Sequence, residues 1–159
     1  MEMSSYKLAV LDLDFTVWDA GGTWCDHLNP PFFKRGGLVF DRNNREIKLY
    51  LDVKRILSYL KEMGVELAVA SKTMEPEWAA ELLKLHDLTS FFSIIEMYPR
   101  NKQKHFDVIQ KHTGFEYQDM IFFDDEFGNI EDVSKLGVTC IYVENGLKFD
   151  LIKKSMFSR

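Results

Sequence analysis

Residues 8–17 read LAVLDLDFTV, an apolar run of strand type that continues into two aspartates spaced one residue apart. The interior of a strand does not accept an unpaired carboxylate, because burying one is costly. Asp12 and Asp14 are therefore expected where the strand ends and solvent or a ligand begins. They offer paired hard oxygen donors that suit a cation such as Mg²⁺. The alternative is an edge turn with two solvated acids.

The composition is that of an ordinary soluble domain, and it excludes several classes of function. The 159 residues are 46% hydrophobic and 28% charged, with a formal net charge of −5 and no basic block. A single well-filled core is therefore expected, and a surface that tracks nucleic-acid phosphates is not. No signal peptide or membrane-spanning run is visible. We expect a cytoplasmic protein without membrane or nucleic-acid partners; its oligomeric state stays open, with a monomer favoured.

Apolar strands alternate with helical patterns along the chain. Strands are expected near residues 7–12, 66–70, 91–97, 120–123 and 138–143, and helices near 53–60, 76–85, 102–112, 130–136 and 149–153. Most strands are apolar on both faces, which is typical of a parallel sheet covered by helices on both sides. We therefore predict an α/β fold, a Rossmann-like three-layer sandwich with a central parallel sheet. Because we find no repeat and no linker, residues 1–159 are expected to form a single domain.

The region between the first strand and the first helix is irregular. Residues 18–33 show no repeating period, and a loop of this length in a compact domain is often functional. Residues 38–40 and 47–49 flank a polar stretch, residues 41–46. This pattern predicts a β-hairpin with an exposed tip, which would project as a small flap. Nothing in the region is long enough to form a large cap domain.

Three of the apolar strands end in polar residues, and one helix begins with a lysine. In chain order these residues are Asp12 with Asp14, Ser71, Lys102, and Asp124 with Asp125. Parallel sheets bind their ligands beyond the carboxyl ends of the strands, so we expect these side chains to gather at one site. Carboxylates can hold Mg²⁺, and a hydroxyl and an ammonium can bind phosphate oxygens. An ionised aspartate is also a nucleophile that forms phospho-enzymes.

In this order the residues resemble the four motifs of the haloacid dehalogenase superfamily. Within it the chain is similar to the magnesium-dependent phosphatase family, through the words LDLDFTVW (11–18), ASKT (70–73), YPRNK (98–102) and IFFDDE (121–126). The resemblance covers nearly the whole chain. It implies a Mg²⁺-dependent phosphomonoester hydrolase that acts through an aspartyl phosphate, in one capless domain.

The resemblance also implies a role for each residue. Asp12 would be the nucleophile, Asp14 the general acid and then the base, and Lys102 the cation that holds the nucleophile. Mg²⁺ would be bound by Asp12, by Asp14 through its backbone carbonyl, and by Asp124. Asp125 is the second choice for that role. Substrate contacts are expected from Thr16, Trp18, Ser71, Lys72 and Arg100. For Thr16 a second expectation is that its hydroxyl or backbone N–H braces the loop that carries the nucleophile.

An uncapped site is open and admits either a phosphorylated small molecule, such as a sugar phosphate, or phosphotyrosine on a phosphoprotein. Two departures from the family pattern leave the substrate preference undecided. These are the glycine-rich loop at residues 19–22 and Arg100, which stands where a small residue is usual. Two alternatives use the same residue types: a phosphotransferase or mutase with the same intermediate, and a noncatalytic phospho-aspartate receiver module. In receivers the phospho-acceptor follows a middle strand, whereas here the paired acids follow the first.

Overall fold

The computed structural model describes residues 3–157 and is built around one parallel sheet. The sheet has five strands in the order β7-β6-β1-β8-β9. They are β1 (Leu8–Leu11), β6 (Glu66–Ser71), β7 (Ile94–Met97), β8 (Met120–Asp124) and β9 (Thr139–Tyr142). Because β1 pairs in parallel with both β6 and β8, the strand that leads into the paired aspartates lies at the centre of the sheet.

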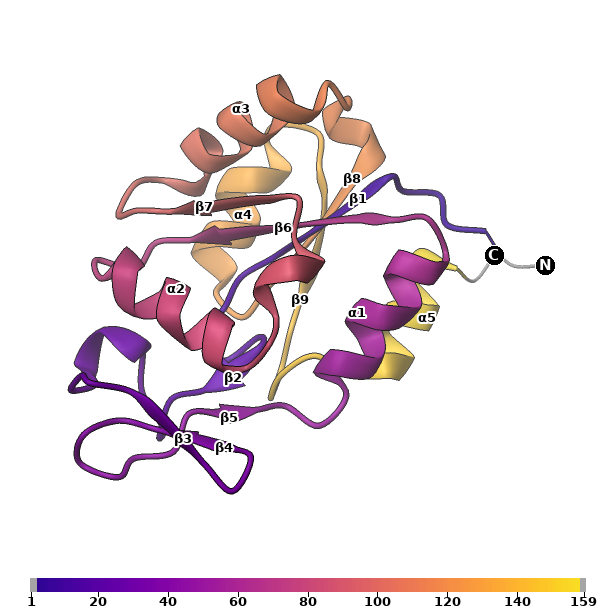
Figure 1. The fold of residues 1–159 in the computed structure, drawn as a ribbon. Coiled ribbons are helices and arrows are strands. Elements are labelled where there is room, and N and C mark those ends of the chain that lie inside the picture. The colour runs from indigo at the N-terminus through magenta and orange to yellow at the C-terminus, as the bar shows by residue number, and fades with distance from the viewer. Residues whose placement is uncertain (1–2, 158–159) are drawn as a thin grey trace.

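Helices cover both faces of this sheet (Figure 1). They are α1 (Val53–Glu62), α2 (Pro76–Leu85) and α5 (Phe149–Met156) on one face, and α3 (Lys102–Thr113) and α4 (Phe127–Ser134) on the other. Alternate residues of β1 point into the two cores, Ala9 and Leu11 into the first and Leu8 and Val10 into the second. The predicted three-layer α/β sandwich is therefore confirmed.

Local sequence signals explain where the helices begin and end. Pro76 occupies the first turn of α2, where its missing N–H costs nothing. The side chain of Asn101 accepts a hydrogen bond from the backbone N–H of Gln103 and so caps α3. That helix ends at Gly114, whose φ of +76° favours glycine. Short 3₁₀ helices lie at η1 (Cys25–His27), η2 (Thr89–Phe91) and η3 (Tyr117–Asp119).

The predicted pairing of residues 38–40 with residues 47–49 is confirmed in part: Phe40 and Glu46 form an antiparallel bridge, and the backbone N–H of Ile47 donates to the carbonyl oxygen of Val39 at 2.9 Å. In addition, β4 (Leu38–Phe40) pairs antiparallel with β3 (Phe33–Arg35). Gly36 and Gly37 join these strands with φ values of +59° and +81°. Positive φ at both central residues is what a two-residue hairpin turn of type I′ requires, and glycine adopts it without strain. The predicted flap therefore exists, and it also contains this hairpin, which lies earlier in the chain than the predicted one.

The polar stretch after β4 is an exposed tip over residues 42–45, as the sequence predicts, but its first residue points inward. Asp41 is fully buried. Its carboxylate accepts hydrogen bonds from the backbone N–H groups of Asn29 and Arg45, at 3.0 and 2.9 Å. β5 (Lys48–Leu49), which follows this stretch, pairs antiparallel with β2 (Trp18–Asp19). These contacts fasten the flap to the loop after β1.

No helix within residues 3–157 has both the length and the apolarity that crossing a bilayer demands.

Candidate active site

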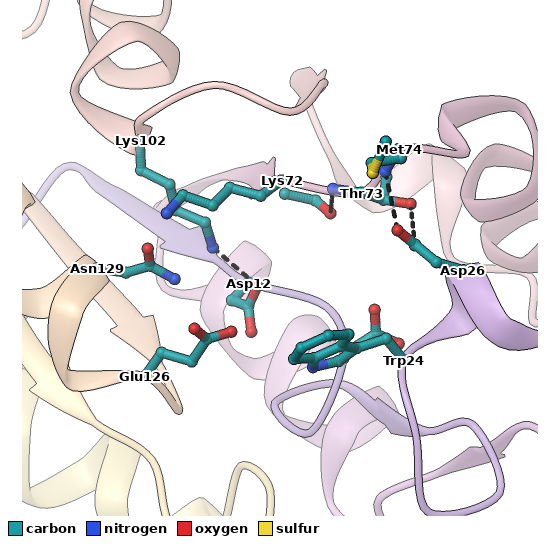
Figure 2. Close-up of a pocket in the computed structure, with 11 residues that line it drawn as sticks. Asp12, Trp24, Asp26, Lys72, Thr73, Met74, Lys102, Glu126 and Asn129 are labelled. Carbon is teal, nitrogen blue, oxygen red and sulfur yellow. Dashed lines mark hydrogen bonds and ion pairs between the residues drawn. The ribbon is translucent and has the colours of Figure 1, made fainter.

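The residues predicted to meet at one edge of the sheet do so in the structure. Asp12 follows β1, Ser71 ends β6, Asp124 ends β8, and Lys102 is the first residue of α3. None of these four residues is more than 9% exposed. Figure 2 shows Lys102 reaching down from α3 toward Asp12. The strand order accounts for this meeting, because β1 lies between β6 and β8.

Lys102 joins two of the strand ends. Its ammonium Nζ donates hydrogen bonds to Oδ1 of Asp12 at 2.8 Å and to Oδ2 of Asp124 at 2.6 Å. Burial lowers the pKa of Lys102, but the negative charges of Asp12 and Asp124 outweigh that effect and raise the pKa overall. The side chain therefore stays charged at neutral pH and offsets the repulsion between the two carboxylates.

A tight turn after β1 fixes the second oxygen of Asp12. Phe15 has a φ of +64°, which is uncommon for a residue other than glycine. The turn brings the hydroxyl of Thr16 to 3.1 Å from Oδ2 of Asp12, to which it donates a hydrogen bond. Thr16 is fully buried. It therefore supports Asp12 from behind, and the predicted substrate contact for Thr16 is wrong.

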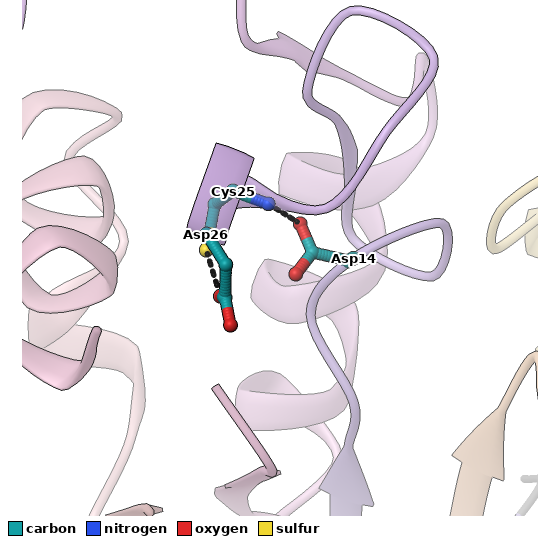
Figure 3. A group of neighbouring side chains, drawn as sticks. All are labelled: Asp14, Cys25 and Asp26. Carbon is teal, nitrogen blue, oxygen red and sulfur yellow. Dashed lines mark hydrogen bonds between the residues drawn. The ribbon is translucent and has the colours of Figure 1, made fainter. Parts of the chain in front are cut away.

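Asp14 is held by two donors on one oxygen. Its Oδ1 accepts hydrogen bonds from the indole N–H of Trp18 at 2.8 Å and from the backbone N–H of Cys25 at 2.9 Å. Figure 3 shows the bond from Cys25. Burial raises the pKa of Asp14 to about 7; the charge of Asp12 adds to the rise, and the bonds from Trp18 and Cys25 partly oppose it. Such a carboxyl can both give and take a proton near neutral pH.

The position of Trp18 contradicts the predicted substrate contact. Its side chain is fully buried, because β2 packs beneath the site. It acts on Asp14 through its indole N–H. The tryptophan that lines the pocket is Trp24, which is 49% exposed.

Three carboxylates form a cluster suited to a divalent cation. Asp12, Asp124 and Asp125 each place an oxygen within 4.8 Å of the others. Burial, followed by interactions with Asp12, raises the pKa of Asp124 to about 6 and that of Asp125 to about 8. Their charged forms are therefore short of compensating positive charge. A hard cation would supply that charge, and carboxylate oxygens are the ligands Mg²⁺ prefers, so the residues fit the ion.

The side chain of Asp124 is also oriented by α4. Its Oδ1 accepts a hydrogen bond from the backbone N–H of Glu126 at 2.9 Å, and its Oδ2 accepts one from the side-chain amide of Asn129 at 3.1 Å. Asn129 is almost fully buried. Nothing in its sequence context singles it out, because it looks like any polar residue of a short helix.

These groups open into a pocket of about 260 Å³. Its lining consists of Asp12, Asp14, Trp24, Asp26, Ser71, Lys72, Thr73, Met74, Lys102, Glu126 and Asn129. Lys72 therefore lies where the sequence places it, whereas Arg100 lines a neighbouring pocket that shares Lys72 and Met74 with the first. Sequence reasoning missed Asp26 and Thr73, which are hydrogen-bonded to each other in one wall of the pocket (Figure 2).

His105 supports the loop that carries Ser71. The imidazole is fully buried, and its Nε2 lies 2.9 Å from the backbone oxygen of Ser71 and 3.0 Å from that of Tyr98. A neutral ring with its proton on Nε2 can donate to both oxygens. Burial lowers the pKa of His105, which favours that neutral form. The ring also stacks on Tyr98, with centroids 4.2 Å apart.

Comparisons with known proteins identify the family of the chain. Residues 4–158 match the family model described as Acid Phosphatase. The chain belongs to this acid phosphatase family. It is 46% identical over 152 residues to Magnesium-dependent phosphatase 1 of Homo sapiens. The aligned residues make up 94% of this chain and 85% of that relative. It is 36% identical over 146 residues to a HAD-like hydrolase superfamily protein of Schizosaccharomyces pombe, over 84% of this chain and 83% of that one.

Solved structures show the same fold at low sequence identity. A haloacid dehalogenase-like hydrolase from Streptococcus pneumoniae superposes with a TM-score of 0.65 at 13% identity, covering 95% of this chain and 91% of that one. 3-Deoxy-D-manno-octulosonate 8-phosphate phosphatase from Moraxella catarrhalis gives a TM-score of 0.56 at 21% identity, covering 91% and 71%. The resemblance to the haloacid dehalogenase superfamily and its magnesium-dependent phosphatases is thus confirmed.

Proposed function

We propose that this magnesium-dependent phosphatase of the haloacid dehalogenase type hydrolyses phosphomonoesters through an aspartyl phosphate on Asp12. The observation that carries the proposal is the fixed orientation of the Asp12 carboxylate. One oxygen accepts from Lys102 at 2.8 Å and the other from Thr16 at 3.1 Å, beside an open pocket. A nucleophile oriented in this way needs little further ordering to attack phosphorus in line.

Residues of the same site would bind Mg²⁺. Asp12 and Asp124 would hold the ion with their side chains, Asp14 with its backbone carbonyl, and Asp125 directly or through water. When bound, Mg²⁺ neutralises charge on the phosphate and polarises its oxygens. Lys102 adds a second positive charge beside the nucleophile. Phosphoryl transfer depends mainly on such positioning and charge neutralisation.

Two steps complete the reaction. An oxygen of Asp12 bonds to phosphorus while the bond to the leaving oxygen breaks, and Asp14 gives its proton to that oxygen. Asp14 then takes a proton from water, whose oxygen attacks phosphorus, frees inorganic phosphate and regenerates the Asp12 carboxylate. The pKa of Asp14, raised to about 7 by burial, suits both roles. The hydroxyl of Ser71 and the ammonium of Lys72 would bind phosphoryl oxygens.

The pocket supports an exposed phosphate as the substrate, on a small molecule such as a sugar phosphate or on a phosphotyrosine side chain. No large cap domain covers it among the described residues. Trp24 and Met74 line it and are 49% and 71% exposed, so they offer apolar contact to a leaving group. Arg100 lines the neighbouring pocket and would meet the more distant parts of a large substrate.

A substrate screen tests this function. Phosphorylated sugars and a phosphotyrosine peptide are incubated with and without Mg²⁺, and inorganic phosphate is measured, with Asp12→Asn as the blank. We expect phosphate release that requires both Mg²⁺ and Asp12. Transfer of the phosphoryl group to a second alcohol without release would indicate a phosphotransferase instead. A stable phospho-enzyme without turnover would indicate a receiver module.

A further inference from the structure

Asp26 joins the two loops that form one wall of the pocket. It belongs to η1, in the loop after β1, and its carboxylate accepts a hydrogen bond from the hydroxyl of Thr73. Its other oxygen accepts one from the backbone N–H of Met74 at 3.0 Å. Thr73 and Met74 belong to the loop after β6. Figure 2 shows the carboxylate of Asp26 pointing at both partners.

Each end of this connection continues to a residue of the proposed mechanism. On the η1 side, Cys25 donates its backbone N–H to Oδ1 of Asp14 at 2.9 Å (Figure 3). On the β6 side, Thr73 donates its backbone N–H to the hydroxyl oxygen of Ser71 at 3.2 Å. A continuous path of covalent and hydrogen bonds thus runs from the general acid through Asp26 to the phosphate-binding hydroxyl.

Little else ties these two loops together. β1 and β6 are paired as far as Leu11 and Val69, but the loops begin beyond that ladder. The other polar contact found between η1 and residues 71–75 in the described chain is the Cys25 thiol, 3.9 Å from Oγ1 of Thr73. A thiol at that distance is a weak partner. The carboxylate of Asp26 therefore makes the main connection.

The arrangement argues against direct binding of substrate by Asp26. Both carboxylate oxygens already accept hydrogen bonds from protein donors. A negative charge would also repel an anionic phosphate ester in the same pocket. Asp26 lies in the pocket wall because it holds Thr73 and Met74 in position.

We propose that Asp26 is a positioning residue that sets the separation between the carboxyl of Asp14 and the hydroxyl of Ser71. The inference rests on the proposed function, in which Asp14 protonates the leaving oxygen and Ser71 binds a phosphoryl oxygen. Both oxygens are bonded to the same phosphorus, so their two protein partners must keep a fixed spacing. Misplacing a catalytic group by about 1 Å can cost about a hundredfold in rate.

The test uses Asp26→Asn and two phosphate esters in Mg²⁺. Asparagine keeps the shape of aspartate, but its amide nitrogen cannot accept a hydrogen bond, so one of the two contacts with Thr73 and Met74 is lost. p-Nitrophenyl phosphate has a leaving group that needs little protonation, whereas glycerol phosphate depends on the general acid. We expect kcat/KM for glycerol phosphate, which reports formation of the phospho-enzyme, to fall about tenfold to hundredfold and kcat/KM for p-nitrophenyl phosphate to fall much less. Hydrolysis of the phospho-enzyme, in which Asp14 acts as the base, is common to both esters and does not enter this comparison.

Asp41→Asn is the matched control. Asp41 is a fully buried aspartate that accepts backbone hydrogen bonds in the flap, but it does not line the pocket. Asp41→Asn should lower the melting temperature without changing the ratio of the two kcat/KM values. Thr73→Val, which removes the hydroxyl partner, should change the ratio in the same direction as Asp26→Asn. Thr73→Val also serves as the test if Asp26→Asn fails to fold. Because both changes break the same connection, the variant that carries both should be no more impaired than the more impaired single variant.

The outcomes separate this inference from the function on which it rests. If the wild-type protein hydrolyses neither ester in Mg²⁺, the proposed function fails and the role of Asp26 fails with it. If the wild-type protein is active and Asp26→Asn and Thr73→Val lower both kcat/KM values by the same factor, or leave both unchanged, the role of Asp26 alone is overturned. A selective loss with glycerol phosphate supports it.

Discussion

The ammonium of Lys102 lies 2.8 Å from Oδ1 of Asp12, although 90 residues separate the two in the chain. The contact forms because α3 begins beside the end of the central strand β1. A buried lysine requires compensating negative charge, and a buried carboxylate requires compensating positive charge. The pair therefore contributes to the packing of the helix against the sheet and orients the proposed nucleophile at the same time.

Lys102→Met removes the cation that Asp12 and Asp124 share. Two buried carboxylates then face each other without compensation, so the free energy of unfolding should fall by about 3 kcal/mol in the metal-free protein at neutral pH. kcat should fall by about a hundredfold or more, because the nucleophile loses its orientation and the phosphate loses a positive neighbour. Urea unfolding and steady-state kinetics measure these effects. A methionine variant with wild-type kcat would contradict the assigned role.

Thr16→Val removes the hydrogen bond to Oδ2 of Asp12 while keeping the shape of the side chain. Hydrogen bonds to charged groups contribute about 1.5–3 kcal/mol, so kcat should fall about tenfold to hundredfold. KM should stay unchanged, because Thr16 is fully buried and does not reach the substrate. Thr16→Ser keeps the hydroxyl and should restore most of kcat. An increase in KM without loss of kcat would instead indicate substrate contact.

Trp18→Phe tests the control of Asp14 by its indole donor. The bond from Trp18 lowers the pKa of Asp14, against burial, which raises it to about 7. Removing the donor should raise the pKa further, so the protonated acid persists to higher pH. The alkaline limb of the kcat profile for an alkyl phosphate should therefore move to higher pH. Trp78→Phe, a change outside the pocket lining, is the control and should leave the alkaline limb in place. If the alkaline limb of Trp18→Phe stays in place or moves to lower pH, Trp18 does not control the pKa of Asp14 in this way.

Magnesium should stabilise the protein more at high pH than at low pH. The pKa values of Asp124 and Asp125 are raised to about 6 and about 8, so the metal-free folded protein holds protons that the unfolded chain releases near pH 4. Its stability is thus lost as the pH rises through those folded pKa values. Mg²⁺ binds the charged carboxylates and offsets the loss. The gain in melting temperature on adding Mg²⁺ should be larger near pH 8.5 than near pH 6.

Asp125→Asn tests whether the carboxylates of the cluster cause the pH dependence of stabilisation by Mg²⁺. It removes the carboxyl with the higher of the two pKa values, so the difference between the two pH values should shrink. Equal stabilisation at both pH values in the wild-type protein would exclude the cluster as the magnesium site. Melting curves in EDTA provide the reference at each pH.

The sheet and the residues at its edge could be predicted because they depend on strong, repeated signals. Runs such as residues 120–123 are apolar on both faces, a pattern typical of strands in a parallel sheet that helices cover on both sides. Once the strands are parallel, their polar ends must lie at one edge, so the meeting of Asp12, Ser71 and Asp124 follows from topology. Lys102 could be placed because it opens the next helix.

The hairpin of β3 with β4 and the wall of the pocket could not be predicted in the same way. β3 contains one apolar residue, Phe33, so its pairing with β4 left no alternation to detect, although Gly36 and Gly37 carried a turn signal. Asp26 gave no sign of its role. Its partners lie in a loop 47 and 48 residues further along the chain, and such a contact depends on tertiary packing alone.

The most direct test of the account is to trap the phospho-enzyme on Asp12. The protein is mixed with Mg²⁺ and a phosphate ester, quenched in acid during turnover, reduced with borohydride and analysed by peptide mass spectrometry. An aspartyl phosphate is reduced to homoserine, whereas a free aspartate is not. We predict homoserine at position 12, dependent on substrate and Mg²⁺. An unmodified Asp12 in an enzyme that is turning over, or reduction at another carboxylate, would contradict the account.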